Sequence, residues 1–108
     1  MIQYSAVMIT PMLSLATLTE CLTQGDLSAE AVLRGTLARI DAHESRVQAW
    51  AHCDREQVLA AARELDRAHT RGPLQGVPFG VKDIFDTFDM PTQYGSTIYR
   101  DHRPSTDA

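Results

Sequence analysis

Hydrophobic residues first recur at helical spacing between Ser14 and Gln24. Ser14 is a residue type that favours a helix N-cap, and Gly25 suits the left-handed residue that ends a helix. A helical period places three apolar side chains of this stretch on one face: Leu15, Leu18 and Leu22. The pattern therefore predicts a helix from about Ser14 to Gln24.

A second amphipathic stretch follows after a short link. Ser28 is expected to cap it, and Glu30 lies in its first turn, where the helix dipole favours an acid. The predicted helix ends near His43. Its expected buried stripe consists of Ala29, Leu33, Leu37 and Ile40.

The period changes to two between Val47 and Cys53, where apolar and polar or aromatic residues alternate. Alternation of this kind predicts a short strand. Asp54 is then expected to cap a third helix that ends before Gly72–Pro73. The apolar face of that helix is predicted to carry Val58, Ala61, Ala62, Leu65 and Ala68.

Composition and charge narrow the class of protein. A chain of 108 residues with 44% hydrophobic and 22% charged residues is typical of one soluble domain. Its formal net charge of -4 and scattered basic residues disfavour nucleic acid as a partner. Lys82 is the single lysine of the chain, whereas arginine occupies the other basic positions.

Neither a membrane segment nor a bound metal is expected. The apolar opening, Met1 to Leu13, lacks a basic start and is interrupted by polar residues, so it does not fit a signal peptide. No stretch is long enough to span a bilayer, so a cytoplasmic location is expected. Cys21 and Cys53 are expected to remain reduced. The four histidines show no metal-ligand spacing, so no metal and no cofactor are predicted.

The most specific pattern begins at Gly72 and reads G-P-L-Q-G-V-P-F-G-V-K-D-I-F-D-T-F-D-M-P-T-Q-Y-G-S, ending at Ser96. It resembles the opening of the amidase-signature family, whose members show a G-x-L-x-G-[IV]-P-[FI]-x-[VI]-K-D segment followed by a D-T…M-P-T…G-S stretch. The lysine of that pattern is Lys82. The resemblance to residues 14–71 is much less specific.

This resemblance implies an α/β fold, namely the N-terminal part of an α/β/α architecture in which a mixed sheet lies between helices. The chain itself would be mostly helical with short strands. Residues 1–71 would form a helical lead-in with one short strand. Residues 72–108 would form the start of the family's core, cut short before the rest of the sheet.

The residues around Lys82 favour a short strand on independent grounds. Side chains alternate along a strand, so one face would carry Val77, Phe79 and Val81, and the other Pro78, Gly80 and Lys82. Glycine and proline neighbours leave room for another backbone to approach the lysine. Asp83 would point away from Lys82 and is expected to hold the following loop rather than to neutralise the lysine.

The resemblance also implies the role of Lys82, which is that of the general base in a Ser–cis-Ser–Lys triad that hydrolyses an amide bond. An amine accepts a proton only when it is uncharged, and a model lysine titrates at about 10.4. A lysine that works as a base near neutral pH must therefore be buried away from acids. The expected substrate is a small-molecule amide.

Both serines of the triad are missing from this chain. The family carries them in a later segment of the G-G-S-S-G-G-S kind, and no such segment occurs between Met1 and Ala108. The serines other than Ser96 are expected in cap or loop positions. We expect the chain to be a fragment that supplies only Lys82, is inactive alone and tends to self-associate.

Two alternatives stay open at this stage. The chain is either a non-enzymatic remnant or interaction module, or a segment like the A subunit of an amidotransferase, which releases ammonia for use on a charged tRNA. The P-T-Q-Y-G-S stretch, ending at Ser96, favours a general amidase over the amidotransferase branch.

Overall fold

A computed structural model describes residues 13–70 and 72–108 of the chain. These residues form helices α1 (Leu15–Gln24), α2 (Ala29–Val47) and α3 (Arg55–Arg67), followed by a short 3-10 helix, η1 (Thr97–Tyr99). The chain divides into two compact units. The helical unit falls within Met1–Gln48 and Asp54–Pro78, and the second, which we call the lysine-bearing unit, within Ala49–Cys53 and Phe79–Ala108.

Helix α1 begins and ends where the sequence predicts. The side chain of Ser14 accepts a hydrogen bond from the Thr17 N–H, and Gly25 takes a left-handed conformation with φ of 80°. The Gly25 N–H then donates to the last free carbonyls of the helix. Both ends are therefore capped by local sequence alone.

Helix α2 receives its N-terminal caps from two places in the sequence. Ser28 accepts from the Ala31 N–H at 3.0 Å, as expected from its position. In addition, the Asp66 carboxylate in α3 accepts from the N–H groups of Ala29 at 2.7 Å and Glu30 at 3.0 Å. The first turn of α2 is thus tied directly to α3.

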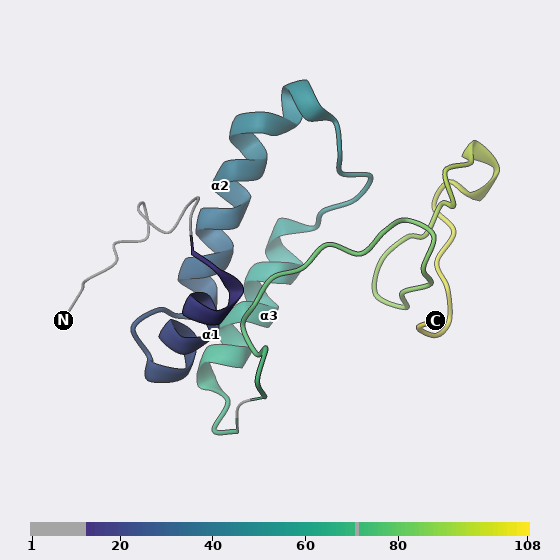
Figure 1. Cartoon of the computed structure of the whole chain (residues 1–108). Coiled ribbons are helices and arrows are strands. Elements are labelled where there is room, and N and C mark those ends of the chain that lie inside the picture. Colours follow the sequence, from purple (N-terminus) through teal and green to yellow (C-terminus); the bar gives the residue numbers. More distant parts are fainter. Residues whose placement is uncertain (1–12, 71) are drawn as a thin grey trace. The chain divides into compact units, whose positions relative to one another are not determined.

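The two longer helices, α2 and α3, run side by side in opposite directions (Figure 1). The core of the helical unit gathers Cys21 and Leu22 from α1, Leu27 from the link and Val32 from α2. Val77, from the segment after α3, packs against this cluster. The predicted stripe of α2 is partly right, because Ala29 and Leu37 are buried, but the pattern missed the buried Val32 and Gly35.

The expected end of the second helix near His43 is wrong, since α2 continues to Val47. No glycine or proline interrupts the residues after His43, so the helix extends until Gln48 adopts a left-handed conformation with φ of 50°. The Gln48 N–H donates to the Glu44 carbonyl at 2.9 Å.

The strand predicted over Val47–Cys53 is also wrong, because α2 takes up its first residue and the rest is irregular, and the strand expected around Lys82 is not confirmed. Residues 13–70 and 72–108 contain no strand, and the mostly helical character is the part of the predicted fold that this structure confirms. A strand needs a neighbour to receive its backbone hydrogen bonds. No described segment pairs with either candidate, so an alternating pattern alone does not produce one.

Gly76 occupies a turn that only a glycine accommodates easily. The Val77 N–H donates to the Leu74 carbonyl at 3.1 Å, which closes a turn with Gly76 at its third position and φ of 89°. A Cβ atom at this position would lie 3.1 Å from the Cβ atom of Ala29 and 3.4 Å from Leu22. The turn therefore depends both on positive φ and on close contact with the helical core.

None of the helices in the described part of the chain is long and apolar enough to cross a membrane. The opening residues 1–12, for which a signal peptide was considered, lie outside the described residues.

Candidate functional site

Lys82 lies in the lysine-bearing unit, in irregular backbone just before a tight turn. Its carbonyl accepts hydrogen bonds from the Ile84 N–H at 2.7 Å and the Phe85 N–H at 3.1 Å. Its side chain is exposed. No ion pair joins it to a carboxylate within residues 13–70 and 72–108.

Asp83 holds the following loop, as the sequence predicts. Its carboxylate accepts from the Gln93 N–H at 2.7 Å, and its carbonyl accepts from the Tyr94 N–H at 3.0 Å. The carboxylate is thereby engaged with backbone rather than with the neighbouring lysine. Asp83, the residue directly after Lys82, is therefore held by hydrogen bonds to both its side chain and its backbone carbonyl.

Thr92 closes the same loop from the inside. It is 1% exposed, the most deeply buried polar residue described. Its hydroxyl donates to the Phe85 carbonyl at 3.1 Å, and its N–H donates to the His102 carbonyl at 2.9 Å. The motif includes Thr92, but its role depends on partners seven and ten residues away, which the sequence pattern does not identify.

Tyr94 is held by a carboxylate and by a second ring. Its phenol donates a hydrogen bond to Asp86, and this bond raises the pKa of Tyr94 above its ordinary value. Its ring meets Tyr99 edge-on, with centroids 5.2 Å apart. The two rings therefore pack against each other edge to face.

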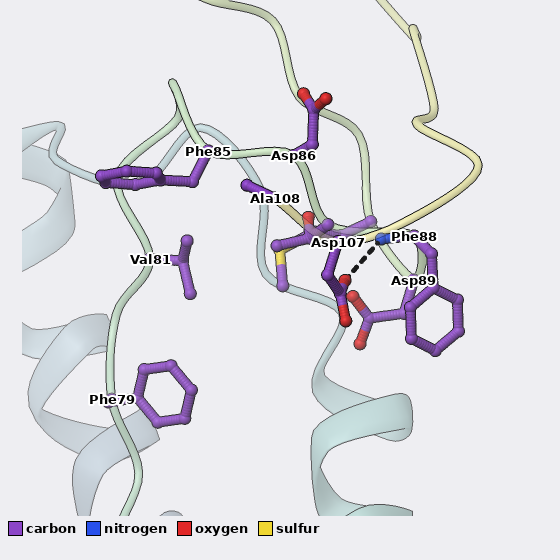
Figure 2. A pocket seen from close by; sticks show the side chains of 10 residues that line it. Phe79, Val81, Phe85, Asp86, Phe88, Asp89, Asp107 and Ala108 are labelled. Atoms are coloured by element: carbon purple, nitrogen blue, oxygen red, sulfur yellow. Dashed lines mark hydrogen bonds between the residues drawn. The ribbon is translucent and has the colours of Figure 1, made fainter.

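A hollow of about 400 Å³ lies on one side of the segment that precedes Lys82 (Figure 2). Phe79 and Val81 line it, together with Phe85, Phe88 and acidic residues, whereas Gly80 and Lys82 do not. This agrees with the predicted alternation, although no sheet is present in the described residues. Lys82 does not belong to this apolar surface.

Three of the described serines cap helices. Ser14, Ser28 and Ser96 each accept a hydrogen bond from a nearby backbone N–H at the start of a helix. Ser45 lies inside α2, so its predicted cap or loop position is wrong, and Ser5 lies outside the described residues. Within the part of the chain that the structure covers, no group of His, Cys, Asp or Glu is arranged to hold a metal ion.

Comparison with known proteins gives these observations a family context. The family model described as Amidase matches residues 31–108. The chain is 43% identical over 100 residues to the A subunit of glutamyl-tRNA(Gln) amidotransferase from Streptomyces avermitilis, covering 89% of this chain and 20% of that protein. It is 40% identical over 100 residues to "Putative amidase AmiD" of Mycobacterium tuberculosis, covering 89% of this chain and 21% of that protein.

Another A subunit of glutamyl-tRNA(Gln) amidotransferase, from Solidesulfovibrio magneticus, is 44% identical over 101 residues. The match covers 89% of this chain and 20% of that relative. The chain therefore spans about a fifth of the length of the curated relatives that it matches.

Proposed function

The chain belongs to the amidase family, and on that premise we propose that it is the segment of an amide hydrolase that supplies the general base, Lys82. The observation that carries the proposal is the position of this lysine. It is the single lysine of the chain, it stands in the family's motif, and it projects from backbone that is fixed immediately after it by Asp83. Its amine is accessible to residues outside this chain.

The proposed reaction moves protons along two hydroxyl groups. A bridging serine, in a cis peptide elsewhere in the full-length enzyme, gives its proton to the neutral Lys82 amine and takes one from the nucleophilic serine. The nucleophile forms a bond to the amide carbonyl carbon, and the C–N bond breaks as the leaving amine receives a proton from Lys82. Water then hydrolyses the acyl-enzyme, and backbone N–H groups stabilise the oxyanion.

The environment that this mechanism requires must come from further chain. Lys82 is exposed here, whereas a lysine is kept neutral near pH 7 by burial away from acids. We propose that in the full-length protein the segment containing Lys82 pairs as a strand of a mixed sheet between helices, in an α/β/α fold. Phe79 and Val81 both line the hollow whereas Lys82 does not, and this difference supports the proposed strand.

The 108-residue chain alone should then be inactive, because no described serine is placed to act with Lys82. Exposed aromatic side chains in the lysine-bearing unit, among them Phe79 at 84% and Phe88 at 62%, support self-association of the isolated chain. Light scattering after gel filtration should detect oligomers, and no ammonia should be released from simple amides. A monodisperse, active chain would contradict both statements.

The full-length enzyme should hydrolyse small carboxamides, with ammonia release as the readout. We expect Lys82→Ala to lower turnover by at least about 1,000-fold, since a positioned acid or base contributes roughly 10² to 10⁴ and the triad acts as a unit. Arg100→Ala removes an exposed cation of the same unit and serves as the matched control with normal turnover. Wild-type turnover in Lys82→Ala would remove the proposed function.

A second candidate is the ammonia-releasing component of an amidotransferase. It is favoured because two of the relatives above are named as A subunits of glutamyl-tRNA(Gln) amidotransferase. The two candidates differ in what they need for activity. An amidase should release ammonia from simple carboxamides with no tRNA or ATP present. Activity confined to glutamine or asparagine, and stimulated by partner proteins and a charged tRNA, would favour the amidotransferase.

A further inference from the structure

Trp50, the single tryptophan of the chain, lies against the backbone of Gly80, two residues before Lys82. A Cβ atom at Gly80 would lie 3.1 Å from Cη2 and 3.4 Å from Cζ3 of the indole. The edge of the six-membered ring therefore occupies the space that any side chain at position 80 would need. Both residues belong to the lysine-bearing unit, and Trp50 is 44% exposed, so this is not a contact of the main core.

The contact lies on the N-terminal side of Lys82. After Lys82 the chain is fixed by the carbonyl of Lys82 and by both acceptors of Asp83. Before it, residues 79–81 make no loop or turn hydrogen bond between backbone groups within the described part of the chain. Packing of the indole on Gly80 is thus a restraint on the N-terminal side of the lysine.

The indole contacts a residue that does not line the hollow beside this segment. Phe79 and Val81 line the hollow seen in Figure 2, whereas Gly80 and Lys82 do not. Alternating side chains place Gly80 and Lys82 on a common side of an extended chain. Trp50 therefore contacts this segment at the position two residues before Lys82, which would share the lysine's side in an extended chain.

We propose that Trp50 is a positioning residue for the amidase reaction, which holds the backbone at Gly80 and thereby sets the direction of Lys82. The inference rests on the proposed function of Lys82. A proton acceptor displaced by about 1 Å can lose on the order of 100-fold in rate, so this restraint has a measurable consequence.

Intrinsic fluorescence of the 108-residue chain tests the contact without any enzyme assay, because Trp50 is the sole tryptophan. Gly80→Val should displace the indole into water and shift its emission to longer wavelength. Gly72→Val is the matched control, since a Cβ atom there meets nothing within 4 Å and the emission should stay unchanged. Identical emission from Gly80→Val and the unmodified chain would overturn the contact.

Kinetics of the full-length enzyme, normalised by active-site titration, test the consequence. Trp50→Ala should lower kcat by about 10- to 100-fold and leave KM nearly unchanged, because the indole touches backbone and not substrate. Trp50→Phe keeps a planar ring and should restore most of kcat. An unchanged kcat per folded Trp50→Ala enzyme would overturn the inference, whatever the yield of folded protein.

The two proposals fail in different ways. If Lys82→Ala retains turnover, the proposed function itself is wrong. If Lys82→Ala is inactive while Trp50→Ala keeps its full kcat, only the positioning role of Trp50 is wrong.

Discussion

The helical unit and the lysine-bearing unit are held by different kinds of contact. In the helical unit, apolar side chains such as Leu22 and Val32 are buried at 2–3% exposure, and each helix starts at a polar cap. In the lysine-bearing unit, Phe79 and Ile98 are 84% and 87% exposed. Hydrogen bonds from loop backbone to groups such as the Asp83 carboxylate hold it instead.

The unit that supplies most of the buried apolar surface is therefore not the unit that contains Lys82. Burial of apolar surface is the main source of folding free energy, and it is concentrated in the helices. The motif that identifies the family lies mostly outside them, among side chains that remain exposed here. This distribution is compatible with the proposed function, in which Lys82 acts together with hydroxyl groups outside residues 1–108.

The largest effect on the helical unit is expected from Gly76→Ala. The substitution forces an alanine into φ of 89° and brings its Cβ atom within 3.1 Å of Ala29. Left-handed backbone and overpacking together should lower the free energy of unfolding by about 2–3 kcal/mol. Urea unfolding followed by circular dichroism measures the change.

Gly72→Ala is the matched control for this substitution, because a Cβ atom there meets nothing within 4 Å. It should change the free energy of unfolding by less than about 0.5 kcal/mol. Equal effects of the two substitutions would break the contrast between a packed and an unpacked part of the chain.

A smaller loss is expected from Asp66→Ala, which removes two hydrogen bonds to the first N–H groups of α2. Loss of such a cap should lower the free energy of unfolding by about 1–2 kcal/mol, measured in the same way. Glu64→Ala, on the same helix, removes only an exposed pair with Arg67 and should cost less than about 0.5 kcal/mol. A loss no greater than that of the control would show that α2 does not depend on α3 for its start.

The smallest effect concerns the pH dependence of the helical unit. Hydrogen bonds from Arg63 and then Arg34 lower the pKa of Glu30 below 4.5. Because the folded-state pKa is the lower one, this contribution to stability is present above the unfolded pKa and is lost as pH falls through the folded pKa. The stability difference between the unmodified chain and Glu30→Gln should therefore be small at neutral pH and vanish in acid.

Thermal unfolding at a series of pH values measures this difference, and added salt should reduce it because the groups are exposed. A difference that persists unchanged below the folded pKa would contradict the assigned cause.

The parts predicted from sequence are those that local chemistry determines. Ser14 and Gly25 cap α1, and Ser28 and Asp54 begin α2 and α3, because a cap needs only residues two or three positions away. The prediction of a strand over Val47–Cys53 was wrong, because a strand needs a second strand as a hydrogen-bonding partner and the periodicity of one segment does not reveal such a partner. The Asp66 cap on Ala29 spans 37 residues and has no local signal.

The candidate site divides in the same manner. The motif drew attention to Lys82, and the alternation around it correctly assigned Asp83 to the following loop. The contacts of Thr92 with Phe85 and of Trp50 with Gly80 join separate segments, so only the folded chain brings them together. The structure thus shows that Trp50 packs beside Gly80.

The account depends most on Lys82 acting as a base, and amide hydrolysis by the full-length Lys82→Arg variant tests this most directly. Arginine keeps the positive charge and a similar length but does not give up its proton in proteins. We predict that the variant folds normally and loses turnover by at least about 1,000-fold, as for Lys82→Ala. Turnover near that of the wild type would show that a fixed charge suffices and that Lys82 accepts no proton.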